Sequence, residues 1–471
     1  MSGSALRAVQ RQARRVVGHS SKIVAGQPTP ETHPELLQPG EIQPGITSFE
    51  FSQRRHHLAH QLPEGGVAVL QSAPQIFMAG VIPYPYRQDA DFQYLTGIIQ
   101  PGPIATIQAN GKFSLFYPDR DAWRETWDGA RLSQDATLEY FGADEAFPLS
   151  EMPQKLSTML ANASAVALDI QRSDVAPLAS AVSQLPAMKT AEGQGKLQSL
   201  RHMVDRLRWV KSPTELDLMR RSAGAAAAAM TECMKISKSG IKEHDLAALF
   251  EYRCRTAGAQ RMAYPPVVAG GANACTIHYS RNDRQVRGDE MILLDGGCEL
   301  YGYCSDVTRT WPVGGTFTGA QAAVYNAVLN THHKLLEEVQ PGATLRQLHH
   351  KSIRLLSENL ADLGVLNGTT ADFLMNSQSY RTFYPHSVGH WLGMDTHDAA
   401  TMSHNRPLEV GVVLTIEPGL YIPDREEFGA LAGIGVRLED DVAVTIDGAE
   451  VLSAAVPLEP KEIEALVGSR L

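Results

Sequence analysis

Cysteine is scarce in this sequence of 471 residues, and the few cysteines show no pattern that would cross-link a fold. There are five, all between positions 233 and 304, and none forms a Cys-x-x-Cys pair. The odd count and the spacing argue against a disulfide framework and against a structural zinc site. A reducing compartment therefore suits the chain better than an oxidising one, and we interpret the cysteines as small buried residues.

Long apolar runs are missing as well, and so is an excess of positive charge. The longest apolar run covers only 223–230, whereas a membrane-spanning helix needs roughly 20 such residues, so we expect no transmembrane helix. The formal net charge is -10, which argues against nucleic acid as the main partner because phosphate binding needs a basic face. The length favours two domains over one.

Acidic residues are absent from the first 30 positions. Residues 1–22 carry four Arg and one Lys, with apolar residues at helical spacing. An amphipathic, Arg-rich N-terminus without acidic residues is typical of an organelle transit peptide, with a disordered basic tail as the alternative. We therefore predict a transit peptide over 1–22.

The next part of the chain predicts an α/β domain preceded by an arm. Proline and glycine are dense in 23–46, which indicates an extended arm. Asn110-Gly111 separates two strand-like segments and predicts a hairpin. We expect the N-terminal domain to span 47–185, with strands over 67–70, 92–98, 104–107, 113–117 and 165–170.

We place a second domain at 205–471, and a helix-start signal lies near its beginning. Ser212 can cap a helix, Pro213 suits its first turn, and Glu215 can complete a capping box. We predict a long alanine-rich helix from here to about Ile236 and a second helix over 243–256.

Two aspartates stand in an expected β-hairpin. Asp295 ends the apolar segment 291–294, and Asp306 follows after the Gly296-Gly297 turn. A carboxylate in an apolar strand is costly unless it is compensated, and two close carboxylates repel each other unless a proton or a metal lies between them. A metal solves both problems, while a hydrogen-bonded structural pair is the alternative.

Three histidines follow within twelve residues: His386, His390 and His397. The first two have the i,i+4 spacing of zinc ligands on a helix, but the Glu of His-Glu-x-x-His is absent. Because Gly389 and Gly393 flank His390, we expect a loop.

Two glutamates complete the set of candidate ligands. Glu417 ends an apolar strand before Pro418-Gly419, and Glu439 follows Arg437. If 435–441 is a strand, Arg437, Glu439 and Asp441 share one face, although a surface ion pair is an alternative for Glu439. Oxygen-rich sets with a single imidazole suit Mn²⁺ or Co²⁺, and two such ions about 3.5 to 4 Å apart can activate water and polarise a carbonyl. The expected ligands are Asp295, Asp306, His390, Glu417 and Glu439.

The order of these five residues resembles the metal set of the pita-bread metallopeptidases, which include methionine aminopeptidase, aminopeptidase P and prolidase. The motifs are Asp-Gly-Gly-Cys-Glu-Leu-Tyr-Gly-Tyr from Asp295, Gly-His-Trp-Leu-Gly-Met-Asp-Thr-His-Asp from Gly389 and Ile-Glu-Pro-Gly-Leu-Tyr from Ile416. Segments 26–30, 86–97 and 258–264 are similar to the mitochondrial Xaa-Pro aminopeptidase 3 group, which includes plant and fungal intermediate cleaving peptidases. The resemblance covers the chain after residue 22.

The resemblance implies a creatinase-like α/β N-terminal domain followed by an α+β pita-bread catalytic domain that uses two Mn²⁺ or Co²⁺ ions. Asp306 and Glu439 would bridge both metals, Asp295 would hold one, and His390 with Glu417 the other. Glu417 would also take the proton of the attacking water. Further residues would contact the substrate or stabilise the tetrahedral state: His278, His386, His397 and Arg437.

The implied activity is removal of one N-terminal residue from imported proteins after presequence cleavage in the mitochondrial matrix, with chloroplast or cytoplasm as alternative locations. The substrates would be peptide or protein N-termini, and the resemblance implies a homodimer. General Xaa-Pro aminopeptidase and prolidase are alternative activities, and methionine aminopeptidase would leave the N-terminal domain unexplained. A non-catalytic peptide-binding module is the alternative of another class, and the complete ligand set argues against it.

Overall fold

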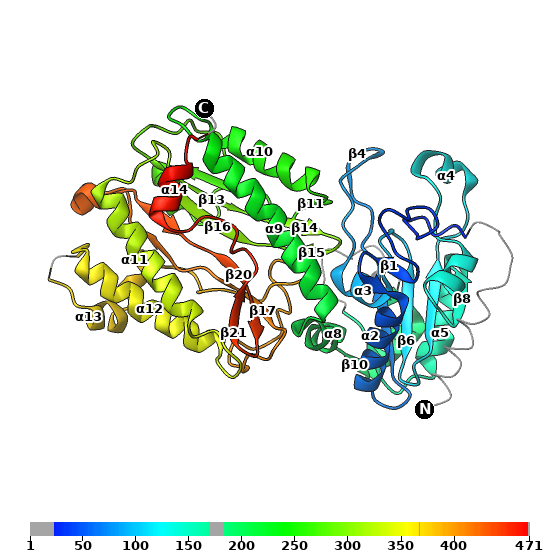
Figure 1. The fold of residues 1–471 in the computed structure, drawn as a ribbon. Coiled ribbons are helices and arrows are strands. Elements are labelled where there is room, and N and C mark those ends of the chain that lie inside the picture. The colour runs from blue at the N-terminus through cyan, green and yellow to red at the C-terminus, as the bar shows by residue number, and fades with distance from the viewer. Residues whose placement is uncertain (1–22, 170–181, 367, 470–471) are drawn as a thin grey trace.

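The computed structural model describes residues 23–169, 182–366 and 368–469, which form two lobes (Figure 1). The predicted transit peptide lies outside the described residues. No helix in the described part of the chain combines the length and the apolar character that crossing a membrane requires.

The N-terminal lobe is built on a six-stranded mixed sheet in the order β10-β9-β3-β6-β7-β8. Its strands are β3 (Val67–Gln71), β6 (Ile104–Gln108), β7 (Phe113–Tyr117), β8 (Glu145–Pro148), β9 (Val166–Ala167) and β10 (Leu197–Gln198). The strands predicted over 67–70, 104–107 and 113–117 are confirmed. β6 and β7 pair antiparallel across the predicted Asn110-Gly111 hairpin, where Gly111 has a positive φ of 84°.

Helices pack on this sheet: α2 (Ser48–Gln61), α3 (Ala90–Thr96), α5 (Met152–Ala161), α7 (Pro186–Gly193) and α8 (Leu200–Trp209). The strand predicted over 92–98 is wrong, because this segment belongs to α3. Asp89 caps that helix by accepting the N–H of Phe92, and Gly97 ends it in a left-handed conformation. Every residue of α3 is buried, including the polar residues Asp91, Gln93 and Thr96, so the helix does not show the one-sided apolar periodicity by which a surface helix is recognised.

The arm before α2 lies on the N-terminal lobe. It contains β1 (Glu41–Gln43) and β2 (Ile46–Thr47), which pair with each other. The side chain of Gln27 donates to the carbonyl of Gly97 and accepts from the N–H of Ile99, each over 3.0 Å. These bonds fasten the start of the arm to the end of α3.

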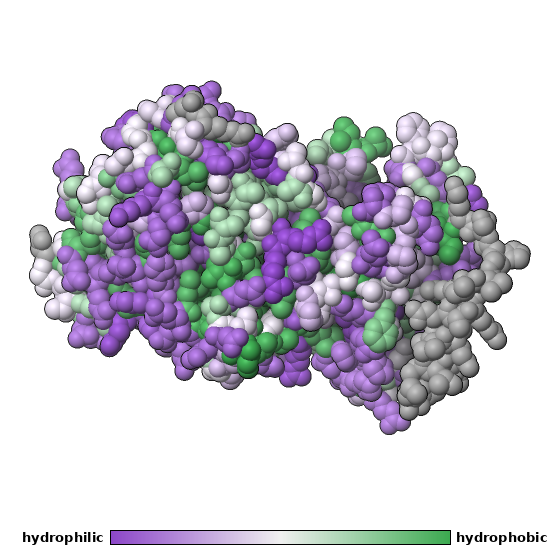
Figure 2. Space-filling view, viewed as in Figure 1, coloured by the Kyte–Doolittle hydropathy of each residue, from purple (hydrophilic) through white to green (hydrophobic). Residues whose placement is uncertain are grey.

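Two further elements project from this lobe: the hairpin of β4 (Phe77–Ala79) and β5 (Ile82–Pro83), and the short helix α4 (Ala122–Asp128). Figure 2 shows hydrophobic side chains at the exposed tip over β4, where Met78 and Val81 are exposed.

The C-terminal lobe begins with α9 (Pro213–Ile236) and α10 (Glu243–Thr256), which agree with both predicted helices. The predicted capping box is present: Ser212 accepts the N–H of Glu215, and the Glu215 carboxylate accepts the N–H of Ser212. The remaining longer helices are α11 (Gly319–Leu336), α12 (Leu345–Asp362), α13 (Ala371–Asn376) and α14 (Pro460–Leu466).

Small antiparallel sheets lie among these helices. One contains β12 (Val267–Gly270), β13 (Met291–Gly296) and β16 (Val307–Pro312), and another contains β17 (Val413–Ile416), β20 (Asp440–Thr445) and β21 (Gly448–Val451). The rest are β11 (Arg261–Met262) with β14 (Cys298–Leu300) and β15 (Tyr303–Cys304), and β18 (Gly419–Tyr421) with β19 (Gly435–Arg437). A bridge between Thr308 and Glu439 joins the first two sheets, while α9 packs on β14–β16 and α11 on β17–β19 (Figure 1).

The cysteines carry no disulfide. All five are free, four of them are buried, and Cys275 is half-buried. This agrees with their interpretation as small packing residues.

Candidate metal centre

Strand ends bring the predicted ligands together between the two joined sheets. Asp295 pairs with Thr308 in the ladder of β13 and β16, so that it lies beside the start of the strand that follows Asp306. Glu417 follows β17 directly, and Glu439 stands between β19 and β20 opposite Thr308. The predicted hairpin therefore exists, although β14 and β15 lengthen its closed end.

His390 reaches the centre from a loop, as predicted. Its N–H donates to the hydroxyl of Thr415 over 3.1 Å, and the N–H of Thr415 donates to the carbonyl of His390 over 2.9 Å. This places the loop along the edge of β17. A Cβ atom at Gly389 would overlap the carbonyl oxygen of Thr415, so the close approach of the two backbones requires glycine there.

Four of the five residues lie close together, with His390 as the shared neighbour. His390 Nε2 is 3.3 Å from Asp306 Oδ2 and 3.8 Å from Glu417 Oε1. One ligand atom from each of Asp306, His390 and Glu439 lies within 4.8 Å of the other two. Because the Tyr264 hydroxyl lies within hydrogen-bonding distance of both Asp295 and Asp306, the fifth ligand adjoins the same cluster.

The buried carboxylates of the cluster have raised pKa values, and a bound cation would stabilise their ionised forms. Burial raises the pKa of Asp295, with the Arg437 charge opposing and the Asp306 charge adding to the shift. Burial also raises the pKa of Glu417 to about 7, against the charges of His390 and Arg437, and raises that of Glu439 further, helped by the charge of Asp306. Buried carboxylates of this kind are compensated by a bound cation.

The pKa of His390 also reflects the negative charge of the cluster. Burial alone would lower its pKa, but the hydrogen bond and charge of Asp306 and the charge of Glu417 raise it to about 9. Its Nδ1 lies 3.1 Å from the carbonyl oxygen of Trp391, so Nδ1 donates there and leaves Nε2 directed toward the carboxylates. An oriented imidazole of this type is the usual form of a histidine metal ligand. The residues present therefore fit divalent metal.

A second group of predicted residues lines the same centre. Arg437, which is 2% exposed, donates to Asp295 and, over 2.9 Å, to the hydroxyl of Tyr421. His386 Nδ1 lies 2.7 Å from the carbonyl oxygen of Ser387, and Nε2 lies 2.8 Å from the Tyr421 hydroxyl. Burial and the charge of Arg437 lower the pKa of His386 to about 3, so this imidazole is neutral and accepts from Tyr421.

The other two predicted histidines approach from different segments. The rings of His397 and His390 pack edge to face with their centroids 4.3 Å apart. Burial and the charge of His390 lower the pKa of His397. His278 lies exposed in the turn after residues 271–275, close enough for its charge to act on both His386 and His397.

Several residues of the centre were not predicted. Tyr264 bridges two carboxylates, Thr308 donates to Glu439 Oε2 over 2.6 Å, and Asp441 accepts the N–H of Asp306 over 3.0 Å. Tyr264 and Tyr421 each end a motif that carried the family resemblance, which is the one sequence signal that could have drawn attention to them.

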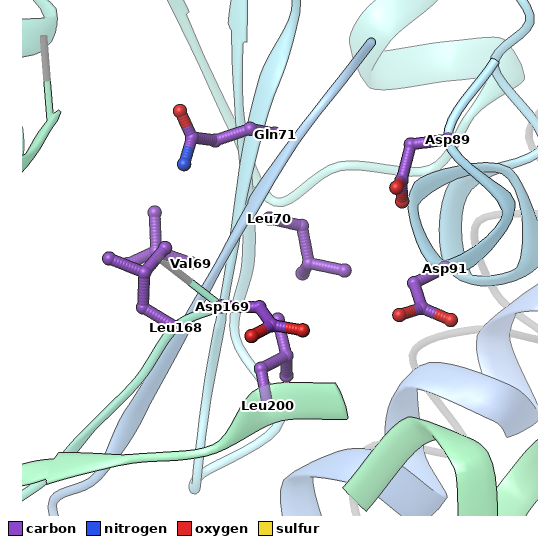
Figure 3. Close-up of a pocket in the computed structure, with 8 residues that line it drawn as sticks. All are labelled: Val69, Leu70, Gln71, Asp89, Asp91, Leu168, Asp169 and Leu200. Atoms are coloured by element: carbon purple, nitrogen blue, oxygen red, sulfur yellow. The ribbon is translucent and has the colours of Figure 1, made fainter. Parts of the chain in front are cut away.

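A separate small pocket lies in the N-terminal lobe (Figure 3) and contains none of these groups. Its lining residues are Val69, Leu70, Gln71, Asp89, Asp91, Leu168, Asp169 and Leu200. Two of its carboxylates already serve the fold, because Asp89 caps α3 and Asp91 pairs with Arg208.

Known proteins share both lobes. Residues 217–446 match Metallopeptidase family M24, and residues 51–167 match Aminopeptidase P, N-terminal domain. The chain is 42% identical to the mitochondrial Intermediate cleaving peptidase 55 of Arabidopsis thaliana, over 94% of this chain and 88% of the relative. It is 40% identical to Xaa-Pro aminopeptidase 3 of mouse, over 94% and 90%. The structure of the aminopeptidase PepP of Pseudomonas aeruginosa superposes with a TM-score of 0.83 at 36% identity, covering 89% of this chain and 98% of that one.

The two lobes and the carboxylate-rich centre define a metalloaminopeptidase with an aminopeptidase P-type N-terminal domain. The chain belongs to metallopeptidase family M24, which implies a divalent metal. The predicted order of an α/β creatinase-like domain before a pita-bread catalytic domain is confirmed by these matches.

Proposed function

We propose that this enzyme removes one N-terminal residue from mitochondrial proteins after their presequences have been cleaved. The observation that carries the proposal is the presence of all five candidate metal ligands in a chain 42% identical, over nearly its whole length, to a mitochondrial intermediate cleaving peptidase. The same likeness supports a mitochondrial location, and we propose the matrix, with residues 1–22 as a transit peptide because they are Arg-rich and contain no acidic residue.

We further propose that the centre holds two Mn²⁺ ions, with Co²⁺ as the other candidate. Asp306 and Glu439 would bridge the metals, Asp295 would hold one, and His390 and Glu417 the other. The short distances from His390 to Asp306 and Glu417 support this division. Bound divalent ions would polarise the scissile carbonyl and lower the pKa of a water molecule.

The protein's own groups would perform the remaining steps. Glu417 would accept the proton of the attacking water and pass it to the departing amine. His278, His386 and His397 would line the substrate and stabilise the negative charge that develops on the carbonyl oxygen. Arg437 would hold Asp295 and Tyr421 in place beside them, as its present hydrogen bonds do.

The domain roles follow from the same likeness. We propose an arm over 23–46, an aminopeptidase P-like N-terminal domain over 47–185 and a pita-bread catalytic domain over 205–471. The protein would act as a homodimer on peptide and protein N-termini.

A general Xaa-Pro aminopeptidase is the second candidate, because the chain is 40% identical to mouse Xaa-Pro aminopeptidase 3. Purified protein with Mn²⁺ would be given two matched peptide sets, one starting with Tyr, Leu or Phe and one carrying proline second. Release of the first residue from the former supports the processing role, and cleavage of Xaa-Pro bonds alone favours the second candidate. Cleavage of dipeptides alone would indicate prolidase, and peptide binding without turnover would indicate a binding module.

The cellular role requires a separate measurement. Mass spectrometry of mitochondrial protein N-termini, with and without this protein, should show one additional residue on its substrates when it is missing. Identical N-termini in both samples would refute the processing role while leaving the peptidase activity intact.

A further inference from the structure

The segment that carries His397 is a tight loop with internal hydrogen bonds. The N–H of Asp398 donates to the carbonyl of Trp391 over 2.9 Å, and the N–H of Asp395 donates to the Asp398 carboxylate over 3.3 Å. A Cβ atom at Gly393 would overlap that carboxylate and lie 3.0 Å from the side chain of Lys211. The loop is therefore closely packed around the Asp398 carboxylate.

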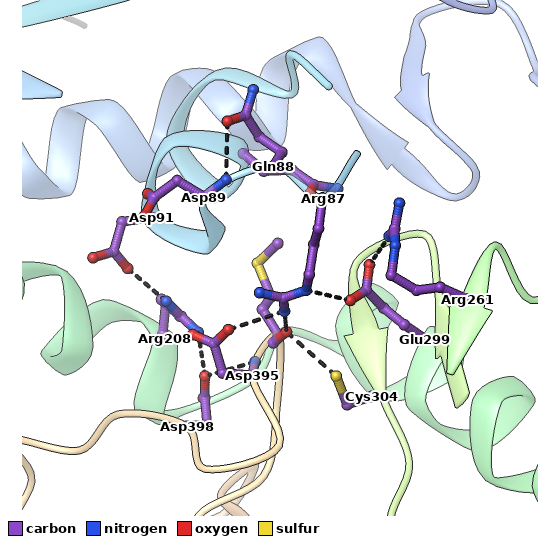
Figure 4. A network of polar contacts seen from close by, with 12 residues as sticks. Arg87, Gln88, Asp89, Asp91, Arg208, Arg261, Glu299, Cys304, Asp395 and Asp398 are labelled. Atoms are coloured by element: carbon purple, nitrogen blue, oxygen red, sulfur yellow. Dashed lines mark hydrogen bonds and ion pairs between the residues drawn. The ribbon is translucent and has the colours of Figure 1, made fainter. Parts of the chain in front are cut away.

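Arg208, at the end of α8, contacts two carboxylates of this loop, Asp395 and Asp398 (Figure 4). It is 3% exposed. Its Nη2 donates to Asp395 Oδ2 over 2.8 Å and to Asp398, while Nη1 donates to Asp91 of α3 over 2.5 Å. One guanidinium thus joins the N-terminal lobe to both carboxylates that flank His397.

Two more cations complete the anchor. Lys211 Nζ is 3.2 Å from the second oxygen of Asp398. Arg87 of the N-terminal lobe donates to Asp395 over 2.9 Å, to the carbonyl of Met394 over 2.8 Å and to Glu299 over 2.6 Å. Residues 394–398 are therefore held by both lobes at once, and His397 is the member of this segment that reaches the metal centre.

We propose that Arg208 is a positioning residue, which fixes the loop of residues 394–398 so that His397 stays packed against His390. The proposal rests on the proposed function, in which His397 lines the substrate. The planar guanidinium makes it possible, because its fork reaches three carboxylates in fixed directions, whereas a lysine ammonium is a single point charge on a flexible stem.

The chain offers a matched control in Arg54. This arginine is 4% exposed and also joins the lobes, since it binds Glu50 over 2.8 Å and lies 3.5 Å from Glu215 of α9. Its hydrogen-bond and ion-pair partners are Glu50, Tyr94, Tyr303 and Glu215, which all lie outside the loop of residues 394–398. Arg54→Lys therefore weakens a buried interlobe contact without releasing His397.

The first test measures hydrogen exchange of residues 391–399 in Mn²⁺-loaded protein for Arg208→Lys, Arg54→Lys and the unmodified chain. Faster exchange in Arg208→Lys alone is expected. Unchanged exchange in Arg208→Lys, or an equal increase in both variants, would overturn the proposal. This readout needs no turnover, so it still decides if the proposed peptidase function fails.

The second test uses turnover of a peptide substrate. A displacement of about 1 Å at a reacting group can cost about 100-fold in rate, so Arg208→Lys should lower kcat by roughly 10-fold to 100-fold with a smaller change in KM. In a His397→Ala background the same substitution should have little further effect on kcat, because residues that act through one another are not additive. Equal losses of kcat in both backgrounds would show that Arg208 does not act through His397.

Discussion

Tyr264 donates its hydroxyl hydrogen to Oδ1 of Asp295 over 2.6 Å. The same hydroxyl lies against Asp306, so one phenol bridges two carboxylates that would otherwise repel each other. Burial, followed by the charges of Asp295 and Asp306, raises the pKa of Tyr264 well above its ordinary value. Without metal, this hydroxyl would reduce the repulsion between the two carboxylates, as bound cations would do in the metal-loaded protein.

Tyr264→Phe should therefore destabilise the metal-free protein more than the metal-loaded protein. A hydrogen bond to a charged group contributes about 1.5 to 3 kcal/mol, and bound cations would replace most of that compensation. The thermal unfolding midpoint would be measured in EDTA and in Mn²⁺. Tyr279→Phe is the control, because Tyr279 binds Glu243 away from the centre over 2.8 Å. An equal loss for Tyr264→Phe in both buffers would contradict this reading of the bridge.

Ser212→Ala should cost more than the loss of an ordinary helix cap. Removal of a serine cap costs about 1 kcal/mol, and the Ser212 hydroxyl also donates to Glu50 of the N-terminal lobe over 2.8 Å. Thr344→Ala is the matched control, since Thr344 forms the same capping box on α12. Urea unfolding should show the larger loss for Ser212→Ala, and equal losses would mean that the bond to Glu50 contributes nothing.

His349 on α12 gives the protein a pH-dependent stability. Burial, aided by the charge of His350, lowers its pKa from 6.5 to about 4. Between these values the unfolded chain binds a proton that the folded chain does not. Stability should therefore fall as the pH drops from about 6.5 to about 4, and this contribution should level off at lower pH.

His349→Gln should flatten this part of the stability curve, which urea unfolding at a series of pH values would reveal. His350→Gln, at the exposed neighbouring position, should keep most of the slope, because burial is the larger cause of the lowered pKa of His349. If His349→Gln keeps the same slope, another group causes the pH dependence.

Short-range sequence signals predicted the helix start at Ser212 correctly, whereas apolar content misled the prediction for residues 92–98. Ser212, Pro213 and Glu215 form the predicted cap because all their partners lie within three residues. Residues 92–98 were predicted wrongly, because a helix buried on all sides looks like a buried strand in sequence. What distinguishes them is the cap at Asp89 and the glycine at 97, which a search for apolar runs overlooks.

In the candidate centre, too, some residues could be proposed from local sequence context and others could not. Its four carboxylates and one imidazole could be proposed from their sequence context, because Asp295 and Glu417 end apolar strands and His390 stands in a glycine-flanked loop. Tyr264 could not be assigned, since its partners are 31 and 42 residues away. Arg208 is harder still, because its partners Asp91 and Asp398 stand 117 and 190 residues from it. Contacts of this kind depend on how the lobes pack, which no local pattern encodes.

Asp306 should matter to both metals and Asp295 to one. Asp306 stands between Tyr264 and His390, with its N–H bound to Asp441, whereas Asp295 is held from the other side by Arg437. Asp306→Ala should therefore abolish peptide hydrolysis, by at least about 1,000-fold, which corresponds to about 4 kcal/mol of lost transition-state stabilisation.

Metal content separates the two aspartates. Mass spectrometry of the metal-loaded proteins should give two Mn²⁺ per chain for the unmodified enzyme, one for Asp295→Ala and fewer than one for Asp306→Ala. Asp447→Ala, in the exposed turn between β20 and β21, should retain both ions and full turnover. Two retained ions and turnover in Asp306→Ala would refute its bridging role, whereas a loss of both ions in Asp295→Ala would mean that the two sites fill only together.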